Sequence, residues 1–70
     1  MKLSSDEAKL LLRAAQLCND QPLKSTLTGA SELAPANYYR ALAALRALGL
    51  SSSRAIPGMI ELIRRIDTAQ

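Results

Sequence analysis

The side chains best suited to polar chemistry lie together near the middle of the chain, at positions 37–40. Asn37, Tyr39 and Arg40 follow Pro35, a residue that suits the first turn of a helix. Asparagine pairs well with adenine, and arginine with guanine or a phosphate group. The start of a helix also offers unpaired backbone amides to a phosphate. The cluster therefore predicts contacts with a nucleic acid.

Each of these side chains also has a structural interpretation that stays open. Asn37 can cap a helix, since asparagine favours that position. Tyr39 can lie at the edge of the core, and Arg40 can be a solvated surface charge. We expect the neighbouring Tyr38 to lie in the core.

The distribution of charge along the chain favours an anionic partner more strongly than the net charge does. The 70 residues include nine basic and six acidic side chains, which gives a net charge of +3. No acidic residue lies between Glu32 and Glu61, and that stretch contains Arg40, Arg46 and Arg54. Positive potential is thus concentrated in the middle of the chain, where it permits nucleic-acid binding.

The amino-acid composition does not favour an enzyme. The chain has no histidine, and its one cysteine, Cys18, has no base beside it in the sequence. The carboxylates are scattered, and no glycine-rich phosphate loop is present. We expect no catalytic residue, no metal site and no cofactor, with Cys18 as a buried filler. The single cysteine and the lack of a leader or membrane-spanning run predict a cytoplasmic protein.

The apolar spacing predicts one all-α domain over residues 1–70, without the alternation of a strand. Ser4 and Glu7 form a capping box at the start of the first helix. Gly49 is expected to end the third helix in the left-handed conformation. An apolar stripe is expected along the last helix, with Leu62 just off it. The members of the stripe are Ile56, Met59, Ile60, Ile63 and Ile66. The four helices are predicted at about residues 5–18, 22–31, 35–48 and 57–68.

The middle two helices have the layout of a helix-turn-helix between Leu23 and Leu50. Ala30 is small enough for the place where the two helices cross, and Leu33 can plug the turn between them. In such a unit the first helix braces the second, which presents its N-terminal residues to the major groove of DNA.

The run from Glu32 to Leu50 resembles the recognition helix of winged helix-turn-helix regulators of the IclR and MarR types. Tyr38 falls where that family has a buried apolar residue, and the leucines and Gly-Leu that follow match its helix core and stop. The resemblance extends over about Asp6 to Leu50. It departs after the recognition helix, because Ser51–Pro57 is short and has no strand pattern. The wing is therefore expected to be absent or vestigial, which favours a four-helix fold.

Together, the pattern and the resemblance imply sequence-specific binding to double-stranded DNA by a small dimeric transcriptional regulator, acting as a repressor. The expected DNA-contacting residues are Lys24, Ser25, Ala36, Asn37, Tyr39, Arg40, Arg46 and Arg54. The expected dimer interface comprises Leu10, Leu17, Leu62 and Ile66. The alternative is a small helical protein-interaction module, of the antitoxin or phage-inhibitor kind, that docks a protein partner through apolar edges. Both interpretations exclude a membrane partner.

Overall fold

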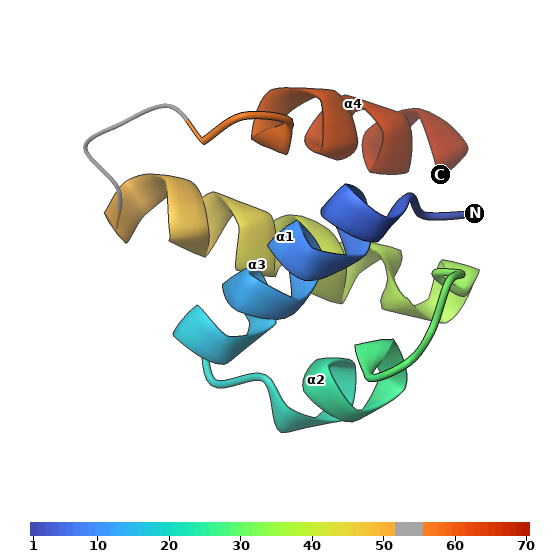
Figure 1. Cartoon of the computed structure of the whole chain (residues 1–70). Helices are drawn as coiled ribbons and strands as arrows, with labels where there is room; N and C mark the ends of the chain where they lie inside the picture. The colour runs from blue at the N-terminus through green and yellow to red at the C-terminus, as the bar shows by residue number, and fades with distance from the viewer. Residues whose placement is uncertain (52–55) are drawn as a thin grey trace.

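A computed structural model describes residues 1–51 and 56–70 (Figure 1). It confirms the all-α class, with helices α1 (Ser5–Leu17), α2 (Gln21–Leu27), α3 (Tyr38–Ser51) and α4 (Met59–Ala69). A short 3-10 turn, η1 (Pro35–Asn37), leads into α3. Within the described ranges the only strand-like feature is one antiparallel bridge between Lys2 and Glu32.

The predicted capping box at the start of α1 is confirmed. The Ser4 hydroxyl accepts a hydrogen bond from the Glu7 backbone N–H at 3.1 Å, and the Ser4 N–H donates to the Glu7 carboxylate at 2.9 Å. Two amides that have no partner within the helix are thereby satisfied. The chain leaves the helix through Asn19, whose φ of 57° reverses its direction toward α2.

Helix α2 is shorter than the sequence predicts. Asp20 caps it by accepting from the Leu23 N–H at 3.2 Å, but the helix ends at Leu27 and not near residue 31. Thr28 already has an extended backbone with a ψ of 112°, and Gly29 after it adopts a φ of +74° that a right-handed helix does not allow. Ala30 consequently lies beyond the helix, so its predicted place at a helix crossing is wrong.

Helix α3 is longer than predicted at its C-terminal end. Gly49 has no positive φ and lies inside the helix, which continues to Ser51. The predicted Schellman stop is therefore wrong. A Cβ at this position would lie 3.1 Å from the Met59 Cε on α4, which is the end of a flexible side chain. Gly49 therefore lies beside α4 and does not end the helix.

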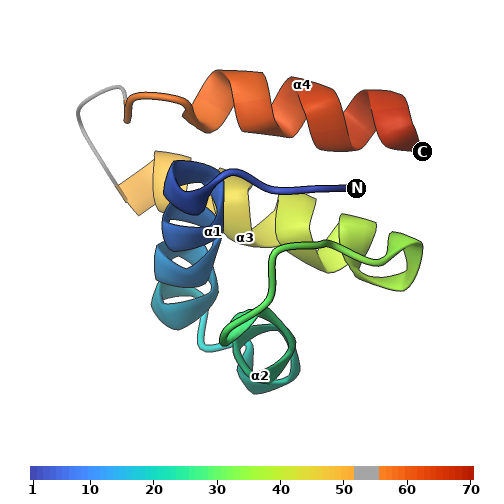
Figure 2. The ribbon, with the colours of Figure 1, turned by 45° about the vertical axis from the view of Figure 1, so that its right-hand side comes forward.

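The core forms where α1 packs against α2 and α3, and where α3 packs against α4 (Figure 2). Small side chains on both partners, among them Ala15 and Ala44, are fully buried and allow α1 and α3 to approach closely. Leu33 and Tyr38 are buried as predicted, so the segment before α3 is anchored in the core.

Helix α4 buries only part of the predicted stripe. Ile66 is fully buried as predicted, but Leu62, which is expected just off the stripe, is also fully buried, and Ile60 is 63% exposed. The buried stripe is thus displaced from the one that the apolar spacing predicts, because α4 packs mainly on α3. Arg65 adds a polar tie, donating hydrogen bonds to the Glu7 carboxylate on α1 and to the Lys2 carbonyl at 2.8 Å.

The N-terminal residues brace the segment between α2 and α3. The Leu3 N–H donates to the Ser31 carbonyl at 2.8 Å, and the Leu33 N–H donates to the Met1 carbonyl at 2.8 Å. This pairing holds the polypeptide that leads into α3. None of the described helices is both long enough and apolar enough to cross a lipid bilayer.

Candidate nucleic-acid interface

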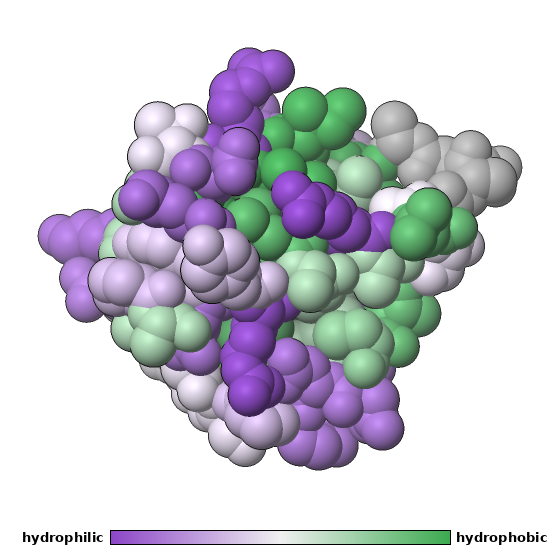
Figure 3. Space-filling model, turned by 180° about the vertical axis from the view of Figure 1, so that it is seen from behind, coloured by the Kyte–Doolittle hydropathy of each residue, from purple (hydrophilic) through white to green (hydrophobic). Residues whose placement is uncertain are grey.

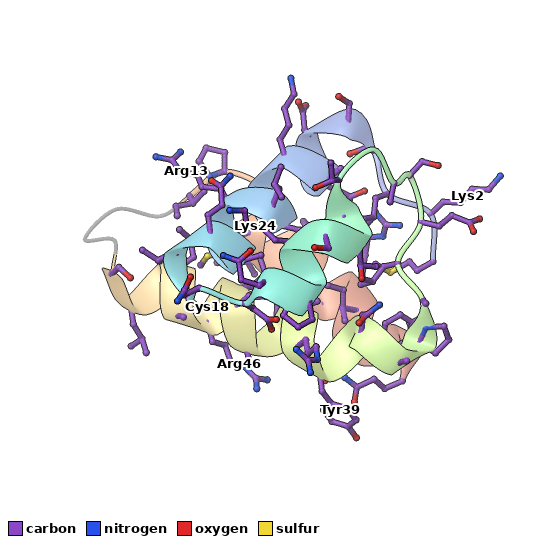
Figure 4. The ribbon with its side chains drawn as sticks, turned by 90° about the horizontal axis from the view of Figure 1, so that it is seen from below. Lys2, Arg13, Cys18, Lys24, Tyr39 and Arg46 are labelled. Carbon is purple, nitrogen blue, oxygen red and sulfur yellow. The ribbon has the colours of Figure 1, made fainter. Side chains whose placement is uncertain are left out.

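The outward face of α3 brings together two of the predicted contact residues. Figure 4 shows Tyr39 and Arg46 pointing away from the body of the protein on the same side of the helix. They are seven positions apart in the sequence, which is about two helical turns. Tyr39 is 77% exposed, and Arg46 is also exposed. Ala43 lies between them and is exposed, so nothing bulky separates the two side chains.

Arg40 occupies a different environment from its neighbours. Its Nη1 donates to the Asp20 carboxylate at 2.9 Å, with 50% of the Arg40 side chain exposed and only 17% of the Asp20 side chain. The same Asp20 oxygen also accepts the capping hydrogen bond of α2. Arg40 is therefore partly committed to holding the first turn of α3 beside the start of α2. No sequence pattern indicates this pair, because the two residues are twenty positions apart.

The remaining predicted contact residues are dispersed. Ala36 is exposed in η1, and Asn37 beside it is half-buried. Ser25 is exposed on α2, but the Lys24 side chain is half-buried and in Figure 4 lies between α1 and α2, apart from Tyr39 and Arg46. Arg54 lies outside the described residues.

The positive charge on α3 is smaller than the sequence predicts, because Asp20 compensates the charge of Arg40. No acidic residue lies on the helix, and the acidic side chain bonded to it, Asp20, already carries Arg40 as a partner. The outward face of α3 is left with net positive charge.

A further ion pair, between Arg65 and Glu7, joins α4 to α1. Burial raises the pKa of Glu7, but the hydrogen bonds from Ser4 and the charge of Arg65 have the larger effect, so the pKa of Glu7 lies below its usual value.

The structure corrects half of the predicted dimer interface. Leu62 and Ile66 are fully buried within the single chain, since both pack in the core, and so neither is available to a second copy. Leu10 is half-buried against the core, and Leu17 is 47% exposed.

Other apolar side chains are more accessible than the predicted interface. Leu50 at the end of α3 is 90% exposed, and Ile60 at the start of α4 is 63% exposed. Figure 3 shows hydrophobic side chains gathered on the side where α3 ends and α4 begins, with hydrophilic side chains over much of the rest of this face. The apolar periodicity of α4 does not indicate this surface, because it predicts that Ile60 lies in the core.

Cys18 is exposed at the end of α1, so its predicted role as a buried filler is wrong. Its thiol donates to the Ala15 carbonyl at 3.7 Å. Over residues 1–51 and 56–70, no three of the Cys, Asp and Glu side chains lie close enough together to hold a metal ion. Comparison of the chain with protein-family models, curated proteins and solved structures found no match.

Proposed function

We propose that this protein binds double-stranded DNA by laying the outward face of α3 in the major groove. One observation carries the proposal, namely that Tyr39 and Arg46 project from the same side of a helix that has no acidic residue. An α-helix with its side chains is about 10–12 Å across, and the major groove is about 12 Å wide. Between the two side chains the small Ala43 would let the helix approach the base edges.

The spacing of the two side chains suits the spacing of base pairs. Seven residues of helix span about 10 Å along the axis, at about 1.5 Å per residue. That distance equals about three base-pair steps of about 3.4 Å. Arg46 would donate to a guanine or a phosphate, and Tyr39 would contact the duplex at the other end of this short stretch. Ala36 and Asn37 would approach the backbone from the start of α3.

A role in transcription and a dimeric state form part of the proposal. Two copies with recognition helices about 34 Å apart would read successive turns of DNA in a palindromic site. Such an arrangement fits a repressor that blocks a promoter. Because Leu62 and Ile66 are core residues, exposed side chains such as Leu17 would have to supply the contact between copies.

The test is a salt series on duplexes selected from a random-sequence pool. We expect affinity to fall steeply between about 50 mM and 200 mM salt, as counterions are released from the phosphates. Arg46→Gln should weaken binding by about 10-fold if Arg46 reads a base, or lower the salt slope by about 0.9 if it binds a phosphate. Arg64→Gln is the matched control, because Arg64 is exposed on α4 beside Glu61. No salt-sensitive binding, or equal losses in both variants, would contradict the proposal.

The exposed apolar side chains support a second candidate function. Leu50 and Ile60 offer a hydrophobic surface of the kind that docks another protein's helix. A contact of this type would weaken little as salt rises, whereas DNA binding would weaken steeply. A salt series on a bound protein partner, set beside the series on duplexes, therefore separates the two functions.

A further inference from the structure

The ion pair between Asp20 and Arg40 adjoins the proposed DNA-binding face. Arg40 lies in the first turn of α3, one residue from Tyr39, and its Nη1 is bonded to Asp20 at 2.9 Å. A guanidinium has five donors, so the pair leaves most of its hydrogen-bonding capacity unused. Half of the Arg40 side chain is exposed, so part of it remains accessible to a ligand. Asp20 is the more buried partner and is fixed by its second role as the cap of α2.

We propose that Asp20 is a positioning residue that determines how Arg40 takes part in DNA binding; the proposal rests on the function proposed above. The Asp20 carboxylate stands where a DNA phosphate would otherwise bind the guanidinium, and it neutralises that charge. Arg40 therefore adds little to non-specific attraction toward phosphates. The ion pair also fixes the orientation of the guanidinium, which lowers the entropy lost when its free edge meets a base or a correctly placed phosphate. Asp20 thus favours specific over non-specific DNA.

The substitution Asp20→Asn isolates this effect. Asparagine caps a helix about as well as aspartate, so the hydrogen bond from the Leu23 N–H can persist while the negative charge is lost. No carboxylate then compensates the charge of Arg40. Each phosphate contact adds about 0.9 to the salt slope, so the loss of affinity between about 50 mM and 200 mM salt should grow about 3.5-fold. Affinity for random duplexes should rise more than affinity for a selected duplex.

A double-substitution cycle with Arg40→Gln tests whether Asp20 acts through Arg40. We expect Asp20→Asn to steepen the salt slope when Arg40 is present and to leave the slope unchanged in the Arg40→Gln background. An equal steepening in both backgrounds would overturn the proposal, since Asp20 would then act as an independent charge. An unchanged slope in the single Asp20→Asn variant would also overturn it. Circular dichroism spectra that match the wild type establish that each variant is folded.

The result distinguishes this inference from the proposed function. If the wild-type protein binds DNA with a steep salt slope but the cycle shows no coupling, only the role of Asp20 is wrong. If the wild-type protein shows no salt-dependent binding to any duplex, the proposed function fails, and the role of Asp20 fails with it.

Discussion

The Arg40 guanidinium lies 2.9 Å from the Asp20 carboxylate, and through this pair the first turn of α3 is joined to the cap of α2. Ala30 lies outside α2, so the small residue expected at a crossing of α2 and α3 is not part of that helix. The contact between the start of α2 and α3 is this polar one.

The two roles of Asp20 should separate in stability measurements. Asp20→Ala removes both the helix cap and the ion pair and should lower the free energy of unfolding by about 1–2 kcal/mol. Asp20→Asn and Arg40→Gln remove only the ion pair and should each cost less than about 1 kcal/mol, because half of the Arg40 side chain is in solvent. Urea denaturation of the three variants checks this order. Equal losses in all three would mean that the cap contributes nothing.

The corrected face of α4 can be tested with two substitutions in the first half of that helix. Leu62→Ala removes a fully buried side chain and should cost about 2–5 kcal/mol. Ile60→Ala removes a side chain that is 63% exposed and should change stability by less than about 0.5 kcal/mol. Thermal and urea unfolding of the two variants provide the comparison. A larger loss for Ile60→Ala than for Leu62→Ala would mean that the stripe predicted from periodicity is the buried one.

Gly49 in α3 and Gly58 at the start of α4 should respond in opposite directions to alanine. Gly49→Ala should stabilise the protein by up to about 1 kcal/mol, because Gly49 lies inside a helix and the Met59 Cε at 3.1 Å is the end of a flexible side chain. Gly58→Ala should destabilise it by about 1–2 kcal/mol, since Gly58 has a φ of +81°. Unfolding midpoints measure both changes. Destabilisation by Gly49→Ala would indicate that Met59 cannot move aside.

The stability of the protein should fall in acid through Glu7. Desolvation raises the pKa of Glu7, but the hydrogen bonds from Ser4 and the charge of Arg65 lower it by a larger amount, so the folded-state pKa is depressed. A carboxylate whose pKa is lower in the folded state than in the unfolded state stabilises the fold at pH values above its unfolded-state pKa of about 4.3. This contribution is lost as the pH falls through the folded-state pKa. Glu7→Gln keeps an acceptor for the Ser4 N–H but carries no charge.

The measurement for Glu7 is the unfolding midpoint between about pH 6 and pH 3. The midpoint of the Glu7→Gln variant should fall less over this range than that of the wild type. Asp6→Asn is the control, because Asp6 is the exposed neighbour of Glu7 in the same helical turn. Parallel curves for the wild type and Glu7→Gln would exclude a contribution from the tie to Arg65.

Local sequence patterns determined much of the fold. The Ser4–Glu7 capping box follows from a spacing of three residues, and the burial of Leu33 and Tyr38 follows from the apolar pattern around the start of α3. The exposure of Arg46 also agrees with its place in the helical repeat. These features could be predicted because each depends on residues within a few turns of one another.

Tertiary structure decided the features that depend on distant partners. Only the packing of α4 on α3 determines that Leu62 is buried and Ile60 exposed, since both are large aliphatic residues in the same helix. The ion pairs of Arg40 with Asp20 and of Arg65 with Glu7 join residues 20 and 58 positions apart, respectively. No periodic pattern in the sequence indicates them. The physical reason is that a repeat shows which side chains are apolar or charged, but the neighbouring helix selects which of them lose contact with water.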